Sequence, residues 1–240
     1  MILGNLQKQT TARRILTLVS PRIFKTIEGD IIIVKSSEIN SNTFKRLFDI
    51  ITSSLVLIFL LSWVFPIISL LIKLNSKGPI IFQQKRIGIN GDIFYCFKFR
   101  TMRVLSQSKY TPTQKNDIRV TKIGSFLRKT NLDELPQILN VLLGDMSIIG
   151  PRPHPIAFHN EYATYIDNID QRLFIKPGIT GLAQIKGYRG DVLDKESNMQ
   201  RTKMRVNLDI LYIKKWSSKL DIYIVYKTAM QMLLKQTNAH

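Results

Sequence analysis

An uncharged apolar stretch over residues 50–72 is the strongest pattern in the chain, with Leu, Ile, Val and Phe on every face of a helix. A helix over these residues would be roughly 34 Å long, which is enough for the hydrocarbon core of a bilayer. A buried helix of a soluble protein is the alternative, but such a helix is seldom apolar on every face over this length. The pattern therefore predicts a helix that inserts into a membrane.

Pro66 interrupts this stretch, and cations flank both of its ends. Lys45 and Arg46 precede it, and Lys73 and Lys77 follow it. Proline removes a backbone donor and kinks a helix, and positive charge on both sides gives no preferred direction of crossing. The sequence thus predicts a re-entrant hairpin that enters and leaves the membrane through one face.

The pattern after the apolar stretch predicts a small β-sheet and then helices. Two short β-like runs, 78–82 and 93–97, flank Asn90 and Gly91, which form a strong turn signal. Residues 104–120 are polar without a clear period and predict a loop. Helical patterns follow at 118–129, from about residue 131, and at 199–235, where Trp and Tyr alternate with Lys as at a membrane interface.

The N-terminal residues 1–44 have a different character. The pattern predicts that they form a basic tail with a short apolar strand at 31–34. Lys8, Arg13 and Arg14 interrupt any continuous apolar core, so the tail is not a secretory signal peptide. The chain is therefore divided into a tail (1–44), a re-entrant membrane helix (45–77) and a cytoplasmic domain (78–240).

Charge and cysteine content narrow the class of protein. Lys and Arg number 35 and Asp and Glu 17, which gives a net charge of +18 and points to polyanionic partners. A nucleic-acid-binding protein would leave the apolar stretch unexplained, and the chain has no recognition motif of that class. The single cysteine, Cys96, excludes an intrachain disulfide and a cysteine-cluster metal site, in agreement with a reducing cytoplasm.

The candidate chemistry lies at Asp133 and Glu134, where an apolar-periodic helix is expected to begin. Acidic residues in a first helical turn often only complement the helix dipole. Here Arg128 precedes the pair, and two prolines hold Arg152 in an extended conformation that aims its guanidinium. Lys98 stands at the end of the second β-like run. The arrangement predicts a nucleophilic carboxylate beside an anionic substrate.

Six segments of the chain, in this order, resemble the successive blocks of a known family: Lys-Arg-Leu-Phe-Asp at 45–49, Ser-Lys-Gly-Pro at 76–79, Lys-Phe-Arg-Thr-Met at 98–102, Leu-Asp-Glu-Leu-Pro-Gln at 132–137, Gly-Pro-Arg-Pro at 150–153 and Lys-Pro-Gly-Ile-Thr-Gly at 176–181. The family is that of the bacterial monotopic phosphoglycosyl transferases, also called bacterial sugar transferases. The family's Ser-Pro helix break reads Phe65-Pro66 here, after about one extra turn.

The resemblance implies an α+β fold: a mostly helical monotopic membrane protein with a re-entrant helix hairpin, a small β-sheet and interfacial amphipathic helices. It places the protein at the bacterial inner membrane, with residues 78–240 as a catalytic domain that faces the cytoplasm. The implied activity is transfer of a sugar 1-phosphate from a UDP-sugar to undecaprenyl phosphate, giving UMP and a polyprenyl diphosphate sugar. This would be the first membrane step of exopolysaccharide or related glycoconjugate synthesis.

The segment 186–191 and several positions between 199 and 221 are more similar to the glucose-1-phosphate transferases of the family, so UDP-glucose is the expected donor. UDP-galactose or an N-acetylated sugar is the alternative, because epimers differ by few contacts. A basic nucleic-acid- or membrane-binding protein is the non-enzyme alternative, and a decayed membrane scaffold is disfavoured because the acidic pair and its arginines are present. Anionic lipid is an expected partner, nucleic acid is not, and self-association into a homo-oligomer is left open.

Roles for individual residues follow from the matched motifs. Asp133 is the expected nucleophile, and Glu134 is expected to help Asp133 hold Mg²⁺ or to act as a base. The remaining expected site residues contact substrate: Arg128, Arg152 and Lys98 at the phosphates, and Arg100, Gln184 and Tyr188 elsewhere. The sequence favours structural roles for His154 and His159.

Overall fold

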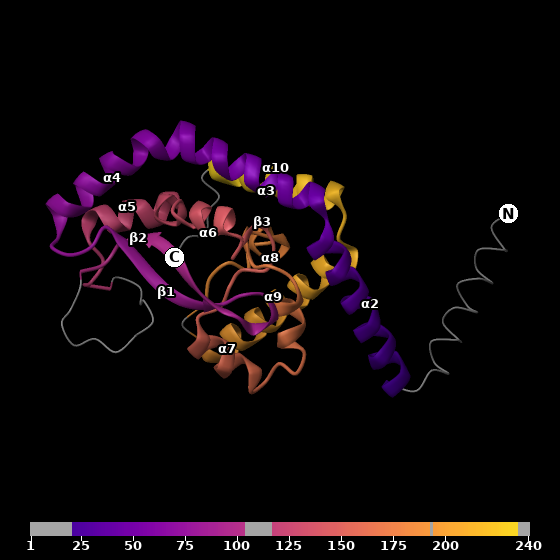
Figure 1. Cartoon of the computed structure of the whole chain (residues 1–240). Helices are drawn as coiled ribbons and strands as arrows, with labels where there is room; N and C mark the ends of the chain where they lie inside the picture. The colour runs from indigo at the N-terminus through magenta and orange to yellow at the C-terminus, as the bar shows by residue number, and fades with distance from the viewer. Residues whose placement is uncertain (1–20, 104–116, 193, 235–240) are drawn as a thin grey trace.

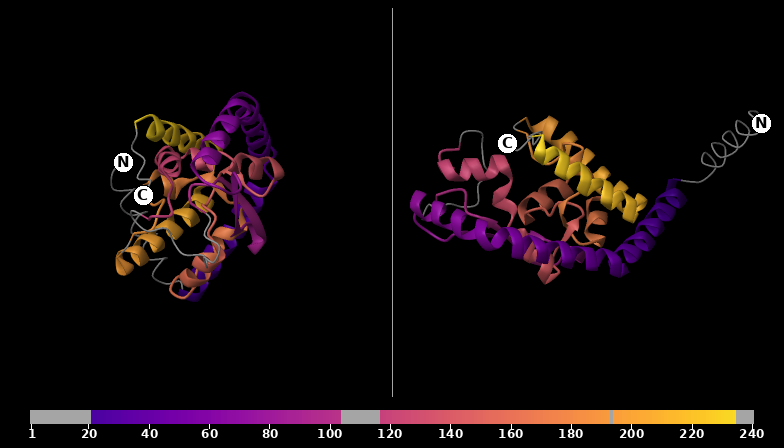
Figure 2. Two further views of the ribbon diagram at one scale, coloured as in Figure 1. Left: turned by 90° about the vertical axis from the view of Figure 1, so that its left-hand side faces the viewer. Right: turned by 90° about the horizontal axis from the view of Figure 1, so that it is seen from above.

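A computed structural model describes residues 21–103, 117–192 and 194–234 of the chain (Figure 1). Residues 1–20 of the expected tail and 104–116 of the expected loop lie outside this part. Helices predominate, and the described residues form two sheets of two strands each, in agreement with the α+β prediction. A long bent helix and the C-terminal helix run along one side of the molecule, and a β-hairpin and shorter helices lie beneath them (Figures 1 and 2).

The α-helices, in chain order, are α2 (Pro21–Ser41), α3 (Thr43–Leu55), α4 (Ser62–Asn75), α5 (Lys122–Thr130), α6 (Gln137–Leu143), α7 (Ile156–Ala163), α8 (Leu182–Ile185), α9 (Lys195–Lys215) and α10 (Ser218–Leu233). The strands are β1 (Ile81–Ile87), β2 (Ile93–Phe99), β3 (Ser147–Ile149) and β4 (Gly178–Thr180). A π-helical segment, η1 (Val56–Leu61), and three 3₁₀ turns, η2 (Ile89–Gly91), η3 (Leu132–Glu134) and η4 (Ile169–Phe174), complete the described elements.

Helix α2 corrects the short strand predicted at 31–34. Ile32, Ser36 and Ile39 are buried at helical spacing, and the hydroxyl of Ser36 donates to the carbonyl of Ile32 at 2.7 Å. This face packs against α9 and joins the main hydrophobic core. Tertiary packing thus outweighs the strand preference of a β-branched run.

The apolar stretch forms one bent helix in which α3, η1 and α4 are continuous over 33 residues. Pro66 lies inside α4, and the π-helical segment precedes it, which are two recognised causes of a helix bend. The hydroxyl of Ser62 donates to the carbonyl of Ile58, and the indole of Trp63 to that of Phe59. Two backbone carbonyls near the bend therefore accept side-chain donors from the helix itself.

Both halves of the bent helix pack on the same domain. At the first half, Arg46 donates to the carbonyls of Val141 and Leu142 at the end of α6, at 2.7 and 2.9 Å. At the second half, Ile72 packs in a cluster with Phe99 of β2. Helix α3 therefore contacts α6 while α4 contacts α5, and the helix lies along the domain (Figure 2).

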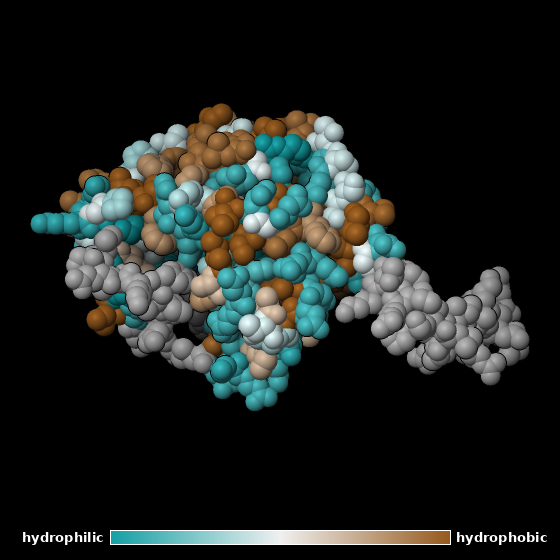
Figure 3. All heavy atoms as spheres, turned by 60° about the horizontal axis from the view of Figure 1, so that its bottom comes forward, coloured by the Kyte–Doolittle hydropathy of each residue, from teal (hydrophilic) through white to brown (hydrophobic). Residues whose placement is uncertain are grey.

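The outward side of the bent helix is apolar. The helix is long and hydrophobic enough to cross a membrane, and only 17% of its most apolar window is buried inside the protein. Its exposed large apolar side chains are Phe44, Leu47, Ile50, Ile51, Leu55, Ile58, Phe59, Trp63, Ile67, Leu70, Leu71 and Leu74. Hydrophobic residues are prominent along the upper edge in Figure 3, and the near lower lobe is mainly hydrophilic.

The small β-sheet predicted after the apolar stretch is present as a β-hairpin. Strands β1 and β2 pair antiparallel from Ile81 opposite Phe99 to Ile87 opposite Ile93, so the first strand begins later and runs further than the sequence predicted. The expected turn at Asn90 is confirmed by the 3₁₀ turn η2 and by the positive φ of Asn90 (55°). Cys96 of β2 is fully buried, as expected of a strand residue facing the core.

The acidic pair lies in a separate turn between two helices, and not in the first turn of one helix as predicted. Helix α5 begins at Lys122, later than expected, and Asn131 ends it in the left-handed conformation, with φ 59°. Asp133 and Glu134 then lie in η3, and α6 begins only after Pro136. The proline fits this boundary because its nitrogen carries no donor, and the first backbone nitrogens of a helix have no acceptor within that helix.

Two short strands that the sequence did not predict position the second half of the site. β3 pairs parallel with β4, which brings residues 147–149 beside residues 178–180. The approach is close, since a Cβ built on Gly178 would lie 2.0 Å from the nitrogen of Gly150. Glycine is therefore required where the two segments meet, and the Pro-Arg-Pro segment leaves from this junction.

Candidate active site

Glu134 is the centre of a cluster of charged side chains from four segments of the chain. Its Oε1 accepts from Nζ of Lys98 at 2.7 Å and from Nη2 of Arg152 at 2.5 Å. Its Oε2 accepts from Nη2 of Arg189 at 2.7 Å and from Nη1 of Arg152 at 3.1 Å. Three cations thus surround one buried carboxylate, and they come from β2, the loop after β3 and the loop after α8.

The Asp133 carboxylate has no such partners. It is nearly as buried as Glu134, at 8% and 7% exposure, yet it makes no hydrogen bond or ion pair with any residue that the structure describes. Burial raises the pKa of Asp133, and the charge of Glu134 raises it further, against the opposing effect of Lys98, Arg128 and Arg189. This direction is opposite to the one that a helix N-terminus alone would give.

The pKa of Glu134 moves the other way. Burial by itself would raise it, but Arg152, Lys98 and Arg189 together hold it well below its ordinary value. Two adjacent carboxyl groups whose pKa values are pushed apart have different chemical capacities. Glu134 is a fixed anion with both oxygens occupied, whereas Asp133 has oxygens that are free to react.

Arg128 reaches the acidic pair from the end of α5. Its Nε donates to Oγ1 of Thr101 at 2.9 Å, which fixes the guanidinium. Burial lowers the pKa of Arg128, and Asp133 opposes that effect, so the two groups are close enough to interact. A Cβ built on Gly124 would lie 1.9 Å from the carbonyl oxygen of Thr101, so α5 can approach this strand end only because residue 124 is glycine.

Arg152 is held from both sides of its backbone. Its carbonyl accepts from Arg172 at 2.5 Å, and the carbonyl of Pro153 accepts from Arg86 at 2.5 Å. Arg172 is itself fixed by a buried ion pair with Asp209 at 2.7 Å. The extended conformation expected from the two prolines is therefore reinforced by side chains from β1 and η4.

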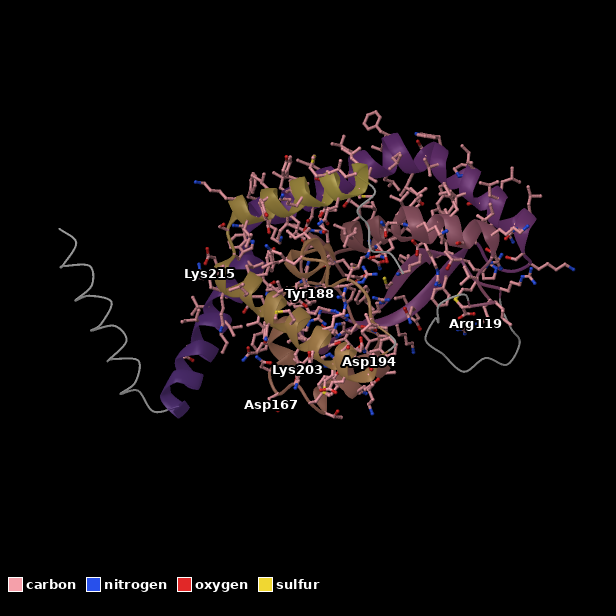
Figure 4. All side chains as sticks on the ribbon, turned by 180° about the vertical axis from the view of Figure 1, so that it is seen from behind. Arg119, Asp167, Tyr188, Asp194, Lys203 and Lys215 are labelled. Atoms are coloured by element: carbon pink, nitrogen blue, oxygen red, sulfur yellow. The ribbon has the colours of Figure 1, made fainter. Side chains whose placement is uncertain are left out.

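The other predicted substrate contacts lie outside this cluster. Arg100 is buried, and its guanidinium donates to the carbonyls of Ser76 and Lys77 at 2.6 Å each. These bonds fix the end of the bent helix to the end of β2. Tyr188 lies in the loop between α8 and α9 (Figure 4), and the guanidinium of Arg201 in α9 lies over its ring. The substrate-binding roles of Arg100 and Tyr188 stay predictions.

Arg189 is the site residue that sequence reasoning missed. The loop that carries it is held by backbone carbonyls: those of Gly187 and Gly190 accept from Arg201, and that of Tyr188 accepts from Arg205 at 3.0 Å. The only local signal was its place in the Gly-Tyr-Arg-Gly segment, where glycines on both sides permit a tight turn. Its partner, 55 positions away, could not be found from that segment alone.

A Mg²⁺ ion would find one free protein ligand here. Asp133 offers unpaired carboxylate oxygens, whereas an ion at Glu134 would have to displace Lys98, Arg152 or Arg189. No group of three His, Cys, Asp or Glu side chains with metal-binding geometry occurs in the described residues. One carboxylate still fits Mg²⁺, because this ion is often held by one or two carboxylates, substrate phosphates and water.

The two histidines near the Pro-Arg-Pro segment are separate from the acidic pair. His159 Nε2 lies 2.9 Å from Oδ1 of Asp170. His154 is buried, and burial together with nearby arginines holds its pKa well below the ordinary value, so it is neutral. Both positions are consistent with the structural roles that the sequence favours.

A cavity of about 580 Å³ opens beside the charged cluster. Glu134, Lys186 and Arg189 line it together with Thr228, Gln231 and Met232 of α10. Gln184, a predicted substrate contact, lines the cavity, and its Nε2 donates to the carbonyl of Ile179 at 3.1 Å.

Comparison with known proteins identifies the family. The sequence pattern of the family described as "Bacterial sugar transferase" matches residues 40–235, which include the acidic pair and all three of its cations. The chain belongs to the bacterial sugar transferase family. The resemblance carried by the six sequence motifs is therefore confirmed.

Individual members of the family show considerable identity. A UDP-glucose:undecaprenyl-phosphate glucose-1-phosphate transferase of Klebsiella pneumoniae is 46% identical over 195 residues, which cover 81% of this chain and 41% of that protein. An exopolysaccharide production protein of Rhizobium leguminosarum bv. phaseoli is 40% identical, over 80% of this chain and 96% of that protein. An undecaprenyl-phosphate galactose phosphotransferase of Salmonella typhimurium is 38% identical, over 84% and 42%.

The related glucose-1-phosphate transferases are longer than this chain. The chain spans 41%, 39% and 34% of the length of three glucose-1-phosphate transferases that it matches at 46 to 47% identity.

Proposed function

We propose that the protein transfers a sugar 1-phosphate from a UDP-sugar to undecaprenyl phosphate, with Asp133 as the nucleophile. The observation that carries the proposal is an unpaired, buried carboxylate next to a second carboxylate whose three cations fix it in place. The names of the related transferases supply the substrate classes.

The transfer takes two displacement steps. In the first, an Oδ of Asp133 attacks the phosphorus that bears the sugar, the bond to the bridging oxygen breaks, and UMP leaves with the electron pair. In the second, an oxygen of the lipid phosphate attacks the same phosphorus, and the bond to Asp133 breaks. The carboxylate is regenerated, and the product is a polyprenyl diphosphate sugar. A covalent intermediate of this type divides one difficult transfer into two easier ones.

The surrounding cations suit a diphosphate substrate. Arg128 uses only its Nε within the described residues, so its two terminal nitrogens remain available for a bidentate contact. Lys98 has donors beyond the one it gives to Glu134. Arg152 contributes a fixed positive charge. These groups would stabilise the charge on the transferred phosphoryl group, which is the main catalytic requirement in phosphoryl transfer.

A Mg²⁺ ion would be held by Asp133 and by phosphate oxygens of the donor, where it would neutralise the charge on the departing UMP. Glu134 is better suited to order the cations than to hold the metal or to act as a base, because its low pKa makes it a weak proton acceptor.

The bent helix would enter one leaflet of the bacterial inner membrane and return to the same side. Both of its halves pack on one domain, whereas the ends of a spanning helix would lie on opposite faces of the bilayer. The exposed apolar side of the helix would face the lipid, and the charged cluster would face the cytoplasm, where UDP-sugars are made. The excess of Lys and Arg would favour anionic lipid.

Glucose is the proposed sugar, and assembly of an exopolysaccharide or related glycoconjugate is the proposed process. The support is the higher identity to proteins named as glucose-1-phosphate transferases, 46% against 38% for the galactose phosphotransferase. A panel of UDP-sugars, assayed for UMP release with undecaprenyl phosphate present, would distinguish glucose from galactose and from N-acetylated sugars.

The covalent step is tested without the lipid acceptor. Purified protein given UDP-glucose and Mg²⁺ should release UMP in an amount equal to the enzyme, and mass spectrometry should place a hexose phosphate on the peptide that contains Asp133. Asp133→Asn should release none, while Asp145→Asn, outside the charged cluster, should behave as the unmodified protein. UMP release that needs the lipid from the first turnover would rule out the two-step mechanism.

A further inference from the structure

The cavity beside Glu134 is lined by apolar side chains and by two cations, Lys186 and Arg189. The apolar wall is formed by Leu135, Ile138, Ile179, Ile185 and Met232, which come from the turn after η3 and from α6, β4, α8 and α10. At about 580 Å³ the cavity falls within the usual size range of ligand sites. Met232, which also lines the cavity, lies on α10, a helix that runs along the same side of the molecule as the bent apolar helix (Figures 1 and 2).

Most uncharged donors in the cavity already have partners within the protein. Gln184 donates to a backbone carbonyl of β4, and Gln231 donates to the carbonyl of Ile185 at 2.8 Å. The hydroxyls of Thr180 and Thr228 lie 2.7 Å apart and bond to each other. A nucleobase or a sugar ring would need such donors to be free, so the cavity offers few uncharged donors to the polar parts of a UDP-sugar.

The two cations that line the cavity, Lys186 and Arg189, are available to bind a ligand. Lys186 lines the cavity, is exposed, and pairs with no carboxylate in the part of the chain that the structure describes. Arg189 binds Glu134 through one nitrogen and is the most exposed of the three cations around it, at 27%. Two accessible cations beside an apolar wall match a ligand with an anionic head and a hydrocarbon chain.

We infer that this cavity is the acceptor site and binds an isoprenoid phosphate. The phosphate lies at Lys186 and Arg189, the first part of the isoprenoid chain lies against the apolar wall, and the rest of the chain leaves past Met232 into the bilayer. The inference rests on the proposed transfer reaction and adds the location of its second substrate. Arg189 would then act as a positioning residue that places an acceptor oxygen on the Glu134 side of Asp133.

A matched pair of variants on α10 tests the location. Met232→Trp would fill the cavity, whereas Leu233→Trp adds the same side chain to the neighbouring exposed position, which does not line it. Both half-reactions are measured in detergent: formation of the phosphosugar adduct from UDP-glucose, and its transfer to undecaprenyl phosphate. In Met232→Trp the rate of adduct formation should be unchanged while KM for the acceptor rises by about tenfold or more. Leu233→Trp should match the unmodified protein in both steps.

A second variant tests the role of Lys186 in binding the phosphate and does not depend on core packing. Lys186→Gln should raise KM for farnesyl phosphate several-fold and leave adduct formation unchanged, and Lys186→Arg should restore the affinity. Farnesol, which lacks the phosphate, should compete with farnesyl phosphate much more weakly in both the unmodified protein and Lys186→Gln.

The outcomes separate the acceptor site from the reaction itself. A raised KM for UDP-glucose in Met232→Trp, with the acceptor unaffected, would make the cavity the donor site and overturn the inference. Unchanged acceptor kinetics in both Met232→Trp and Lys186→Gln would overturn it as well. An unmodified protein that forms no adduct and transfers no sugar phosphate from any UDP-sugar would instead refute the proposed function.

Discussion

At the scale of single residues, the acidic pair owes its chemistry to an unequal distribution of cations. Asp133 and Glu134 are adjacent and similarly buried, but Arg152, Lys98 and Arg189 all bond to Glu134. The negative charge of Glu134 is one reason why the pKa of Asp133 is raised. Glu134 therefore affects the nucleophile through its charge and through the cations that it holds.

This arrangement predicts the pH dependence of adduct formation. Asp133 attacks in its ionised form, so the rate should fall as the pH drops through its pKa, which lies above the ordinary value for an aspartate. Glu134→Gln removes a charge that raises this pKa and frees Lys98 and Arg189, whose charges lower it. The acid limb of the pH–rate profile should therefore move to lower pH, even if the maximal rate decreases because the cations are less well ordered.

The measurement is the rate of UMP release without acceptor, as a function of pH. Glu196→Gln, an exposed carboxylate in α9, serves as the control and should leave the profile in place. An acid limb that stays in place or moves to higher pH in Glu134→Gln would show that Asp133 is not the group that titrates.

Sequence reasoning found both carboxylates but could not assign their environments. The motifs pointed to Asp133, Glu134, Lys98, Arg128 and Arg152, and the structure brings these five together. The motifs did not show that Glu134 would take all three bonded cations, or that Arg189 would be one of them. Those contacts depend on the relative positions of β2, the loop after β3 and the loop after α8, which no local pattern reports.

At the scale of elements, the position of α5 depends on one close contact. Gly124→Ala would place a methyl group 1.9 Å from the carbonyl oxygen of Thr101. We expect a loss of about 1–3 kcal/mol in the free energy of unfolding, as for other overpacked sites, and slower adduct formation because Arg128 would be displaced. Chemical denaturation in detergent and the UMP-release assay would measure the two effects.

Gly29→Ala is the matched control for this prediction. Gly29 also lies in a helix, α2, and a Cβ there would meet nothing within 4 Å. Replacement of an unconstrained helical glycine by alanine should raise the stability by ~0.5–1 kcal/mol. Equal stability and equal adduct formation in Gly124→Ala and the unmodified protein would show that the contact with Thr101 does not position Arg128.

The elements also show which patterns can be read from sequence. The bent helix and the β1–β2 hairpin were predicted because long apolar runs and turn residues are strong local signals. The strand predicted at 31–34 was wrong because packing against α9 decided the conformation of that run. β3 and β4 were missed since each has three residues and its partner lies about thirty positions away.

At the scale of the whole molecule, the bent helix is joined to the domain at both ends. Near its start, Lys45 forms a buried ion pair with Asp221 of α10 at 2.8 Å, and Tyr212 and Trp216 also donate to that carboxylate. Near its end, Arg100 holds the backbone that follows α4. A helix that crossed the bilayer would have to give up one of these two sets of contacts.

The last prediction follows from these contacts: residues 41 and 77 lie on the same, cytoplasmic side of the membrane. Single cysteines at these exposed positions, Ser41→Cys and Lys77→Cys, are made in a Cys96→Ala background and tested with an impermeant maleimide. Both should resist labelling in intact spheroplasts and react after lysis. Lys203→Cys in α9, part of the same domain (Figure 4), is the control and should behave identically. Labelling of Ser41→Cys alone in intact spheroplasts would show that the helix spans the bilayer. A spanning helix would also place the early cations of the chain outside, against the positive-inside bias, which is a further reason to expect the same-side result.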